Sequence, residues 1–449
     1  MKQPISFTQG PVGKVLYQLA LPGVIGLGAS MSFNIADTFF VGRLGSESLA
    51  AMSFTFPIVL LITTLGIGFA TGTSSVYARM LGLKMPQEAR QMAGDTLLLC
   101  LAISTTVMML GWQLMEPTFQ LLGAKPALLP LINQYMWAWY WNTPFFCLSM
   151  VISAILQASG HNKIAGTLMI WSAIANIILD PILIFGLGPI PGLAIAGAAW
   201  TTVFTRVLLT GLALYLAIHR YQLISIPHLR GPAMLRSWRA VMKVGVPTMA
   251  TNLIIPIFSG AALVLVSSFG PEAVAAMGIT QRLEPLLLIV LIGLANILGP
   301  FVGQNMVPEH RARLPQALAA SSRFSLVYGL VCALLLWLCG GLISKAFTDS
   351  ARVISIAATY LAIVPLSYGL QGISMAANSS FNGLGKPLPG AAISALRVLV
   401  IFVPLALLGK YWFGLVGIFV AVALANSLAG IIGYFWLRQT YRKATLQSI

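Results

Sequence analysis

The chain has 449 residues, of which 58% are hydrophobic and only 8% are charged. Soluble domains carry about 25% charged residues, so this composition excludes a chain of ordinary soluble domains. The formal net charge is +16, but the basic residues are spread over short segments and are not gathered on one domain. That distribution argues against a nucleic-acid-binding protein.

Apolar runs recur along the whole chain, and each is long enough to cross a bilayer, which takes about 20 residues. We therefore predict an all-α polytopic membrane protein. The twelve predicted transmembrane helices cover residues 15–41, 53–79, 94–115, 131–157, 163–187, 192–218, 241–268, 276–304, 317–342, 353–380, 387–409 and 413–437.

The longest polar stretch divides the predicted spans into two sets of six. This division predicts an N-terminal lobe over residues 1–218, a cytoplasmic linker over 219–240 and a C-terminal lobe over 241–449.

The two halves repeat in sequence. The segment from Gly45 reads GSESLAAM, and the segment from Gly270, 225 residues later, reads GPEAVAAM. The same offset relates Pro22 to Pro247. A constant offset indicates a duplicated unit. Because each unit has six spans, the two repeats run in the same direction, as in transporters whose repeats surround a central site.

Lysine and arginine alternate between the two sides of the predicted membrane. The even-numbered loops and both tails hold eighteen of these residues, and the odd-numbered loops hold five. Because cytoplasmic loops carry an excess of Lys and Arg, we expect both termini in the cytoplasm.

Charged residues inside spans are costly and are functional candidates by default. Asp37 lies about one turn, and Asp180 about two turns, inside the outer end of its span. Asn176 shares a helical face with Asp180, and Thr201 and Thr202 lie at similar depth. Desolvation and a neighbouring like charge both disfavour an ionised carboxylate, so this acid pair is suited to taking up and releasing a proton.

Structural interpretations exist for the same residues. In the alternative interpretation, Asp37 lies in the outer headgroup layer of the membrane. Asp180 then caps a kink in its span before Pro181. Asn176 and Thr202 also fit packing between helices, where polar side chains commonly form hydrogen bonds. Arg206 is either a cavity-lining residue or a structural partner of a buried carboxylate.

The second half lacks the acid pair, because the positions equivalent to Asp37 and Asp180 are Ala262 and Leu405. The candidate site residue of the second half is Glu284, about two turns inside its span. The alternative is that Glu284 lies at the rim of the site. We therefore expect the coupling chemistry in the first half only.

Residues 136–141 read MWAWYW and open the fourth span. Such a run is typical of an interfacial aromatic belt. The alternative is an aromatic wall, including Tyr140, that attracts cationic amphiphiles through its ring faces.

Three segments together resemble the multidrug and toxic compound extrusion (MATE) family of transporters. They read NIADTFFVGRLG from Asn34, NIILDP from Asn176 and GAAWTT from Gly197. The resemblance covers essentially the whole chain and is closest to the DinF-like prokaryotic branch. It implies a proton-linked site in the N-terminal lobe at Asp37, Asn176, Asp180 and Thr202. Asn34, Thr201, Arg206, Tyr140 and Glu284 are candidate lining residues.

The resemblance implies a secondary transporter of the bacterial inner membrane that exports drugs or toxic organic cations by antiport. We expect a monomer with no cofactor and no metal site, coupled to protons and not to sodium. Sodium coupling and a lipid-linked oligosaccharide flippase of the same superfamily are the alternatives. The sequence shows no nucleophile–base pair or metal cluster, so we do not expect an enzyme.

Overall fold

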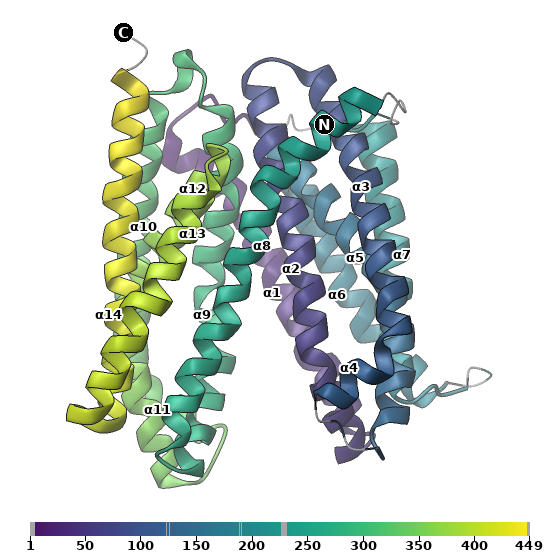
Figure 1. Cartoon of the computed structure of the whole chain (residues 1–449), viewed down its shortest axis with the longest axis vertical. Helices are drawn as coiled ribbons and strands as arrows, with labels where there is room; N and C mark the ends of the chain where they lie inside the picture. The colour runs from purple at the N-terminus through teal and green to yellow at the C-terminus, as the bar shows by residue number, and fades with distance from the viewer. Residues whose placement is uncertain are drawn as a thin grey trace. The chain divides into compact units, whose positions relative to one another are not determined.

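The structure of the chain is a computed structural model. It describes residues 5–122, 124, 126–187, 189, 191–225 and 231–446. Nearly all of these residues are helical, which confirms the predicted all-α fold class (Figure 1).

The helices of the first half are, in chain order, α1 (Val12–Gly42), α2 (Ser46–Gly82), α3 (Pro86–Gln113), α4 (Met115–Leu121), α5 (Leu129–Ala158), α6 (Asn162–Phe185) and α7 (Ile195–Tyr215). Those of the second half are α8 (Gly231–Ser267), α9 (Pro271–Gln304), α10 (Arg313–Lys345), α11 (Ala351–Ile363), α12 (Tyr368–Gly383), α13 (Pro387–Ala395) and α14 (Val403–Leu446). Short π- and 3₁₀-helical segments join some of them, namely η1 (Leu216–Arg220), η2 (Pro308–His310), η3 (Val364–Ser367) and η4 (Leu396–Phe402).

Among the described residues, eleven helical stretches are long and apolar enough to cross a membrane. The last of them, Pro387–Lys443, has 57 residues, nearly three times the roughly 20 residues that a single span needs. Its backbone is non-helical at Gly414, with φ 59° and ψ −135°. A Cβ atom on Gly417 would lie 2.0 Å from the carbonyl oxygen of Gly409. Residues eight apart come this close only if the chain reverses, so this stretch contains the eleventh and twelfth predicted spans.

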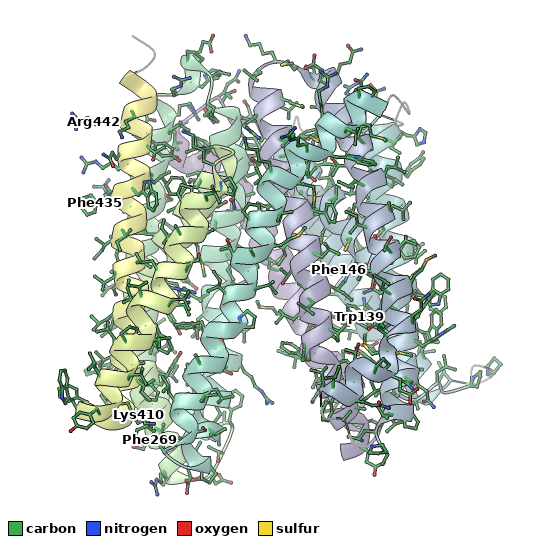
Figure 2. The ribbon with its side chains drawn as sticks, viewed as in Figure 1. Trp139, Phe146, Phe269, Lys410, Phe435 and Arg442 are labelled. Atoms are coloured by element: carbon green, nitrogen blue, oxygen red, sulfur yellow. The ribbon has the colours of Figure 1, made fainter. Side chains whose placement is uncertain are left out.

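The chain reversal packs on the end of α8. The Gly414 position faces the Phe269 ring. The Nζ atom of Lys410 lies 5.8 Å from the centroid of the same ring (Figure 2).

Equivalent glycines have the same backbone conformation in the two halves, as the repeat predicts. Gly45, before α2, has φ 117° and ψ 169°, and Gly270, before α9, has φ 101° and ψ 173°. A positive φ favours glycine because it has no Cβ atom. The repeat in sequence is therefore also a repeat in backbone geometry.

The chain forms two compact units whose boundaries fall at the equivalent prolines. The first unit contains residues 21–246, and the second contains 5–20 and 247–449. The first segment of α1, before Pro22, therefore packs with the second unit. The first segment of α8, before Pro247, packs with the first unit. The predicted linker over 219–240 lies within the first of these units, and α8 begins inside it at Gly231; its residues 226–230 lie outside the described residues.

Specific contacts hold each exchanged segment in its unit. In the second unit, Arg313 Nη1 donates a hydrogen bond of 2.8 Å to the Gly10 carbonyl. The apolar side chains of residues 7–20 pack against α9, including Phe301. In the first unit, Ser237 Oγ donates to Asp95 Oδ2 at 2.8 Å.

The fourth span is central in each unit. In the first unit α5 packs against α2, α3 and α7, and in the second unit α12 packs against α9, α10 and α14. α1 and α6 approach closely, since a Cβ atom on Gly166 would lie 2.3 Å from the carbonyl oxygen of Pro22. Residues on one face of α5 line a cavity of the first unit.

Candidate functional site

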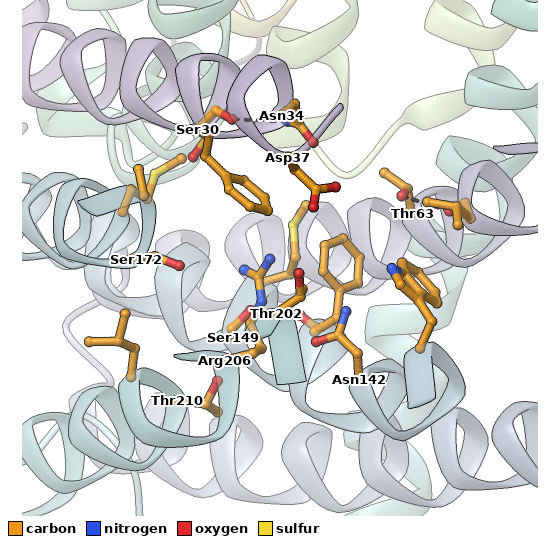
Figure 3. A pocket seen from close by; sticks show the side chains of 18 of the residues that line it. Ser30, Asn34, Asp37, Thr63, Asn142, Ser149, Ser172, Thr202, Arg206 and Thr210 are labelled. Carbon is orange, nitrogen blue, oxygen red and sulfur yellow. Dashed lines mark hydrogen bonds between the residues drawn. The ribbon is translucent and has the colours of Figure 1, made fainter. Parts of the chain in front are cut away.

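The first unit contains a cavity of about 710 Å³, and its wall consists of residues from α1, α2, α5, α6 and α7. A volume of roughly 300–1,000 Å³ is typical of small-molecule sites. Two of the lining residues are charged, Asp37 on α1 and Arg206 on α7. Figure 3 shows Asp37 on one side of the cavity, and Asn142, Thr202 and Arg206 on the other.

The face of α1 toward the cavity follows the helical period. Leu27, Ser30, Asn34 and Asp37 line it at spacings of three and four residues, which places them on one side of the helix. Asn34 Nδ2 donates 2.9 Å to the Ser30 carbonyl, and Thr38 Oγ1 donates 2.8 Å to the Asn34 carbonyl. These bonds hold both side chains close to the helix and leave the Asp37 carboxylate facing the cavity.

Asp180 lies behind the cavity wall. Its side chain is fully buried and does not line the cavity. Asp37 and Tyr135 both lie close enough to interact with it electrostatically. The neighbouring Thr201 hydroxyl donates its hydrogen bond to the Gly197 carbonyl at 3.0 Å. Within the described part of the chain, neither carboxylate oxygen of Asp180 has a hydrogen-bond partner.

The other residues suggested by the sequence divide into two layers. Asn34, Thr202 and Arg206 line the cavity with Asp37. Asn176 is buried behind it beside Asp180, and its Nδ2 donates 2.7 Å to the Ser172 carbonyl. The structure thus brings the predicted cluster together, but only part of it faces the open space.

Tyr140 does not line the cavity. It is buried in the apolar core of the first unit, where its ring packs directly on Gly111. Trp139, one position earlier, lines the cavity instead. The rings of Trp137 and Trp141 lie 6.2 Å and 5.0 Å from Trp112 and remain partly exposed. The aromatic run therefore faces two environments, because successive residues of a helix point in different directions.

Several polar residues of this wall were not among the residues suggested by the sequence, and Tyr135 and Asn142 on α5 are two of them. Asn142 is 1% exposed, and its Oδ1 has no hydrogen-bond partner among the described residues. With Trp139, Phe146, Ser149 and Ser153 they form a stripe of lining residues at helical spacing. The helical spacing of these residues is visible in the sequence, but it overlaps the aromatic run at 136–141, which itself indicates an interfacial belt or an aromatic wall.

Glu284 lies outside this cavity, in the second unit. Tyr360 Oη donates 3.2 Å to its Oε2, and Arg397 lies close enough to interact with it electrostatically. Arg397 Nη1 also donates to Asn426 Oδ1 at 3.4 Å, and Asn426 Nδ2 donates to Gln371 Oε1 at 3.3 Å. The second unit therefore has a separate polar cluster, and it contains one acid.

Comparison with known proteins identifies the family. The family model described as MatE matches residues 22–182 and 247–408, which are corresponding parts of the two halves. The FAD transporter of Shewanella oneidensis is 34% identical over 435 residues, which cover 97% of this chain and 96% of the relative. The multidrug export protein MepA of Staphylococcus aureus is 25% identical over 427 residues, covering 95% and 93%.

The fold matches solved structures of transporters. The bent form of the Vibrio cholerae MATE transporter VcmN superposes with a TM-score of 0.92 at 28% identity, covering 97% of this chain and 98% of that one. A transporter from Pyrococcus furiosus superposes with a TM-score of 0.90 at 23% identity, covering 99% of both chains. The matched halves, the twelve spans and the cavity in the first unit agree with these findings. The chain belongs to the MATE family and is a multi-pass secondary transporter, not an enzyme.

Proposed function

We propose that the chain is a proton-coupled antiporter that exports amphiphilic organic compounds, including cations, through the cavity of the first unit. The supporting observation is the pairing of Asp37, on the cavity wall, with Asp180, which is buried behind it and has no hydrogen-bond partner among the described residues. Two neighbouring carboxylates away from water are costly when both are ionised, and a proton removes that cost. A pair with these properties responds to protonation, as a coupling site must.

The exchange follows from differential affinity for two states. A proton that reaches the pair neutralises it and lets the surrounding helices repack, with α1 bending between Pro22 and Gly28. The substrate instead favours the state in which the pair is ionised. Proton and substrate then displace each other because each binds one state better.

The wall of the cavity fits amphiphilic substrates. It combines rings such as Trp139 and Phe146 with hydroxyl and amide groups such as Thr202 and Asn142. Sites for organic ligands commonly have this composition. No cofactor takes part in the proposed mechanism, and the coupling ion is the proton.

A second candidate function is export of FAD. It is favoured by the relative of that name, which is 34% identical over nearly the full length of both chains. In either case we propose a monomer in the bacterial cytoplasmic membrane with both termini in the cytoplasm, as the distribution of Lys and Arg indicates.

Transport by purified protein in sealed vesicles tests the proposal. Vesicles are loaded with ethidium or with FAD, and release is followed after a pH gradient or a sodium gradient is imposed. Wild-type protein is expected to respond to the pH gradient. Asp37→Asn and Asp180→Asn are expected to lose that response, since neither asparagine takes up a proton.

Asp349→Asn is the matched control, because it removes the same charge from an exposed position. It is expected to transport like the wild type. Unchanged pH-driven release in both Asp37→Asn and Asp180→Asn contradicts the mechanism. Release that responds to the sodium gradient and not to the pH gradient identifies sodium as the coupling ion. The compound that is released separates the two candidate functions.

A further inference from the structure

Arg206 lines the cavity of the first unit and has no acidic partner among the described residues. It lies one helical turn after Thr202 on α7. Its guanidinium carbon is 5.2 Å from the centroid of the Phe146 ring on α5. Within the described part of the chain, neither Asp37 nor any other carboxylate forms an ion pair with Arg206.

An arginine in this position needs an explanation. Its guanidinium group stays protonated in proteins, and a charge inside a membrane protein is normally paired or faces a functional cavity. The contact with Phe146 compensates for part of the desolvation, because a ring face attracts a cation. The contact with the ring satisfies none of the five N–H donors of the guanidinium. Among the described residues these donors have no acidic partner and remain available to a ligand in the cavity.

Five N–H groups in a fixed plane match the geometry of acidic groups with two or more oxygens. We propose that Arg206 binds an anionic group of the substrate, so that the cavity takes aromatic amphiphiles that carry a sulfonate, phosphate or carboxylate. The aromatic part then packs against Phe146 and Trp139, which line the same cavity. This inference deepens the proposed function and rests on it only in taking this cavity as the substrate site.

Two fluorescent probes that differ by one acidic group test the inference. They are 8-anilinonaphthalene-1-sulfonate and the neutral N-phenyl-1-naphthylamine. Their saturable binding is measured on the protein in phosphatidylcholine nanodiscs, with the signal of empty nanodiscs subtracted. Arg206→Gln is expected to weaken sulfonate binding about tenfold or more, as for loss of a hydrogen bond to a charged group. Binding of the neutral probe is expected to stay within about threefold, because it has no group for the guanidinium.

Three further variants separate charge from structure. Arg206→Lys keeps the charge without the planar fork, so its sulfonate affinity is expected between those of the wild type and Arg206→Gln. Asp37→Asn removes negative charge from the same cavity and is expected to tighten sulfonate binding. Arg323→Gln removes the same charge from an exposed position on α10 and is expected to bind both probes like the wild type.

Sulfonate affinity that is unchanged in Arg206→Gln overturns the inference. Equal weakening of both probes also overturns it, because it shows that Arg206 only maintains the shape of the cavity. In nanodiscs with added phosphatidylglycerol, loss of the Arg206-dependent signal identifies a lipid headgroup as the occupant and overturns the assignment to an exported substrate.

Binding and transport separate this inference from the proposed function. Binding needs no gradient, so Arg206-dependent binding without pH-driven release contradicts the proposed function alone. Conversely, Asp37-dependent release of ethidium together with sulfonate binding that does not depend on Arg206 contradicts this inference alone.

Discussion

The hydroxyl group of Tyr360, on α11, donates a hydrogen bond of 3.2 Å to Oε2 of Glu284, on α9. Arg397, in the π-helical segment η4, interacts with the same carboxylate. Three separate elements of the second unit therefore meet at one acid. At the 225-residue offset, Glu284 and Arg397 correspond to Val59 and Ser172, so the first unit has no equivalent charges at these positions.

The cluster is expected to stabilise the fold. Glu284→Gln leaves Arg397 without its acidic neighbour, and loss of such a charged interaction costs about 1.5–3 kcal/mol. The thermal unfolding midpoint of the purified variant is expected to fall. The double variant Glu284→Gln with Arg397→Gln is expected to recover part of the loss, because no unpaired charge remains. Strictly additive effects of the two substitutions contradict an interaction between these residues.

Transport is expected to depend less on Glu284 than on Asp37. If coupling resides in the first unit, Glu284→Gln changes the pH-driven release rate by no more than about fivefold, which corresponds to about 1 kcal/mol. Rates are normalised to the amount of folded protein, so that instability does not count as lost coupling. A loss of pH response as complete as in Asp37→Asn places a second coupling site in the second unit.

The contact between α1 and α6 is expected to tolerate no side chain at Gly166. A Cβ atom there would lie 2.3 Å from the Pro22 carbonyl oxygen, and overpacking of this kind costs about 1–3 kcal/mol. Gly166→Ala is therefore expected to lower the unfolding midpoint. Gly211→Ala on α7 is the matched control, since nothing lies within 4 Å of its Cβ position. Because alanine is favoured over glycine inside a helix, Gly211→Ala is expected to raise the free energy of unfolding by up to about 1 kcal/mol. Equal unfolding midpoints of the two variants contradict a close approach of Gly166 to Pro22.

Stability is expected to fall in acid through His161, in the turn between α5 and α6. Burial lowers the pKa of His161, and a hydrogen bond with the Ser159 backbone opposes part of this effect. The folded state thus disfavours the imidazolium, and the unfolded chain binds the proton more readily. The resulting stabilisation is present above the ordinary pKa of 6.5 and is lost as the pH falls below it.

His161→Phe isolates this effect. It keeps a ring against Tyr221, whose centroid is 4.5 Å from that of His161, and removes the titrating group. The unfolding midpoint of this variant is expected to fall less between pH 7.5 and pH 5.5 than that of the wild type. Parallel falls of the two proteins contradict a contribution from His161.

Much of the architecture could be predicted from the sequence because it depends on local patterns. The number of spans follows from apolar runs whose length matches the bilayer. The duplication follows from a constant offset, which the equivalent conformations of Gly45 and Gly270 reproduce. The motifs around Asp37 and Asp180 indicated the family that the comparisons establish.

The boundaries of the two units could not be predicted in this way. The polar linker suggested a division at 219–240, whereas the two units meet between residues 20 and 21 and between residues 246 and 247, inside α1 and α8. Contacts such as the one between Ser237 and Asp95 connect segments that are 142 residues apart. The composition along the chain does not indicate which distant segment a helix packs against.

The sequence by itself determined the twelve spans, the repeat, the family and the identity of the acids inside the membrane, because hydrophobic length and local motifs specify them. Only the tertiary structure decided that Asp37 faces the cavity while Asp180 lies behind it, and that Trp139 and not Tyr140 lines the wall. It also revealed that Arg206 lies beside Phe146 and forms no ion pair with any described carboxylate. The physical reason is that the rotation of each helix about its own axis is set by packing with its neighbours, and a rotation of one residue moves a side chain from the cavity to the core.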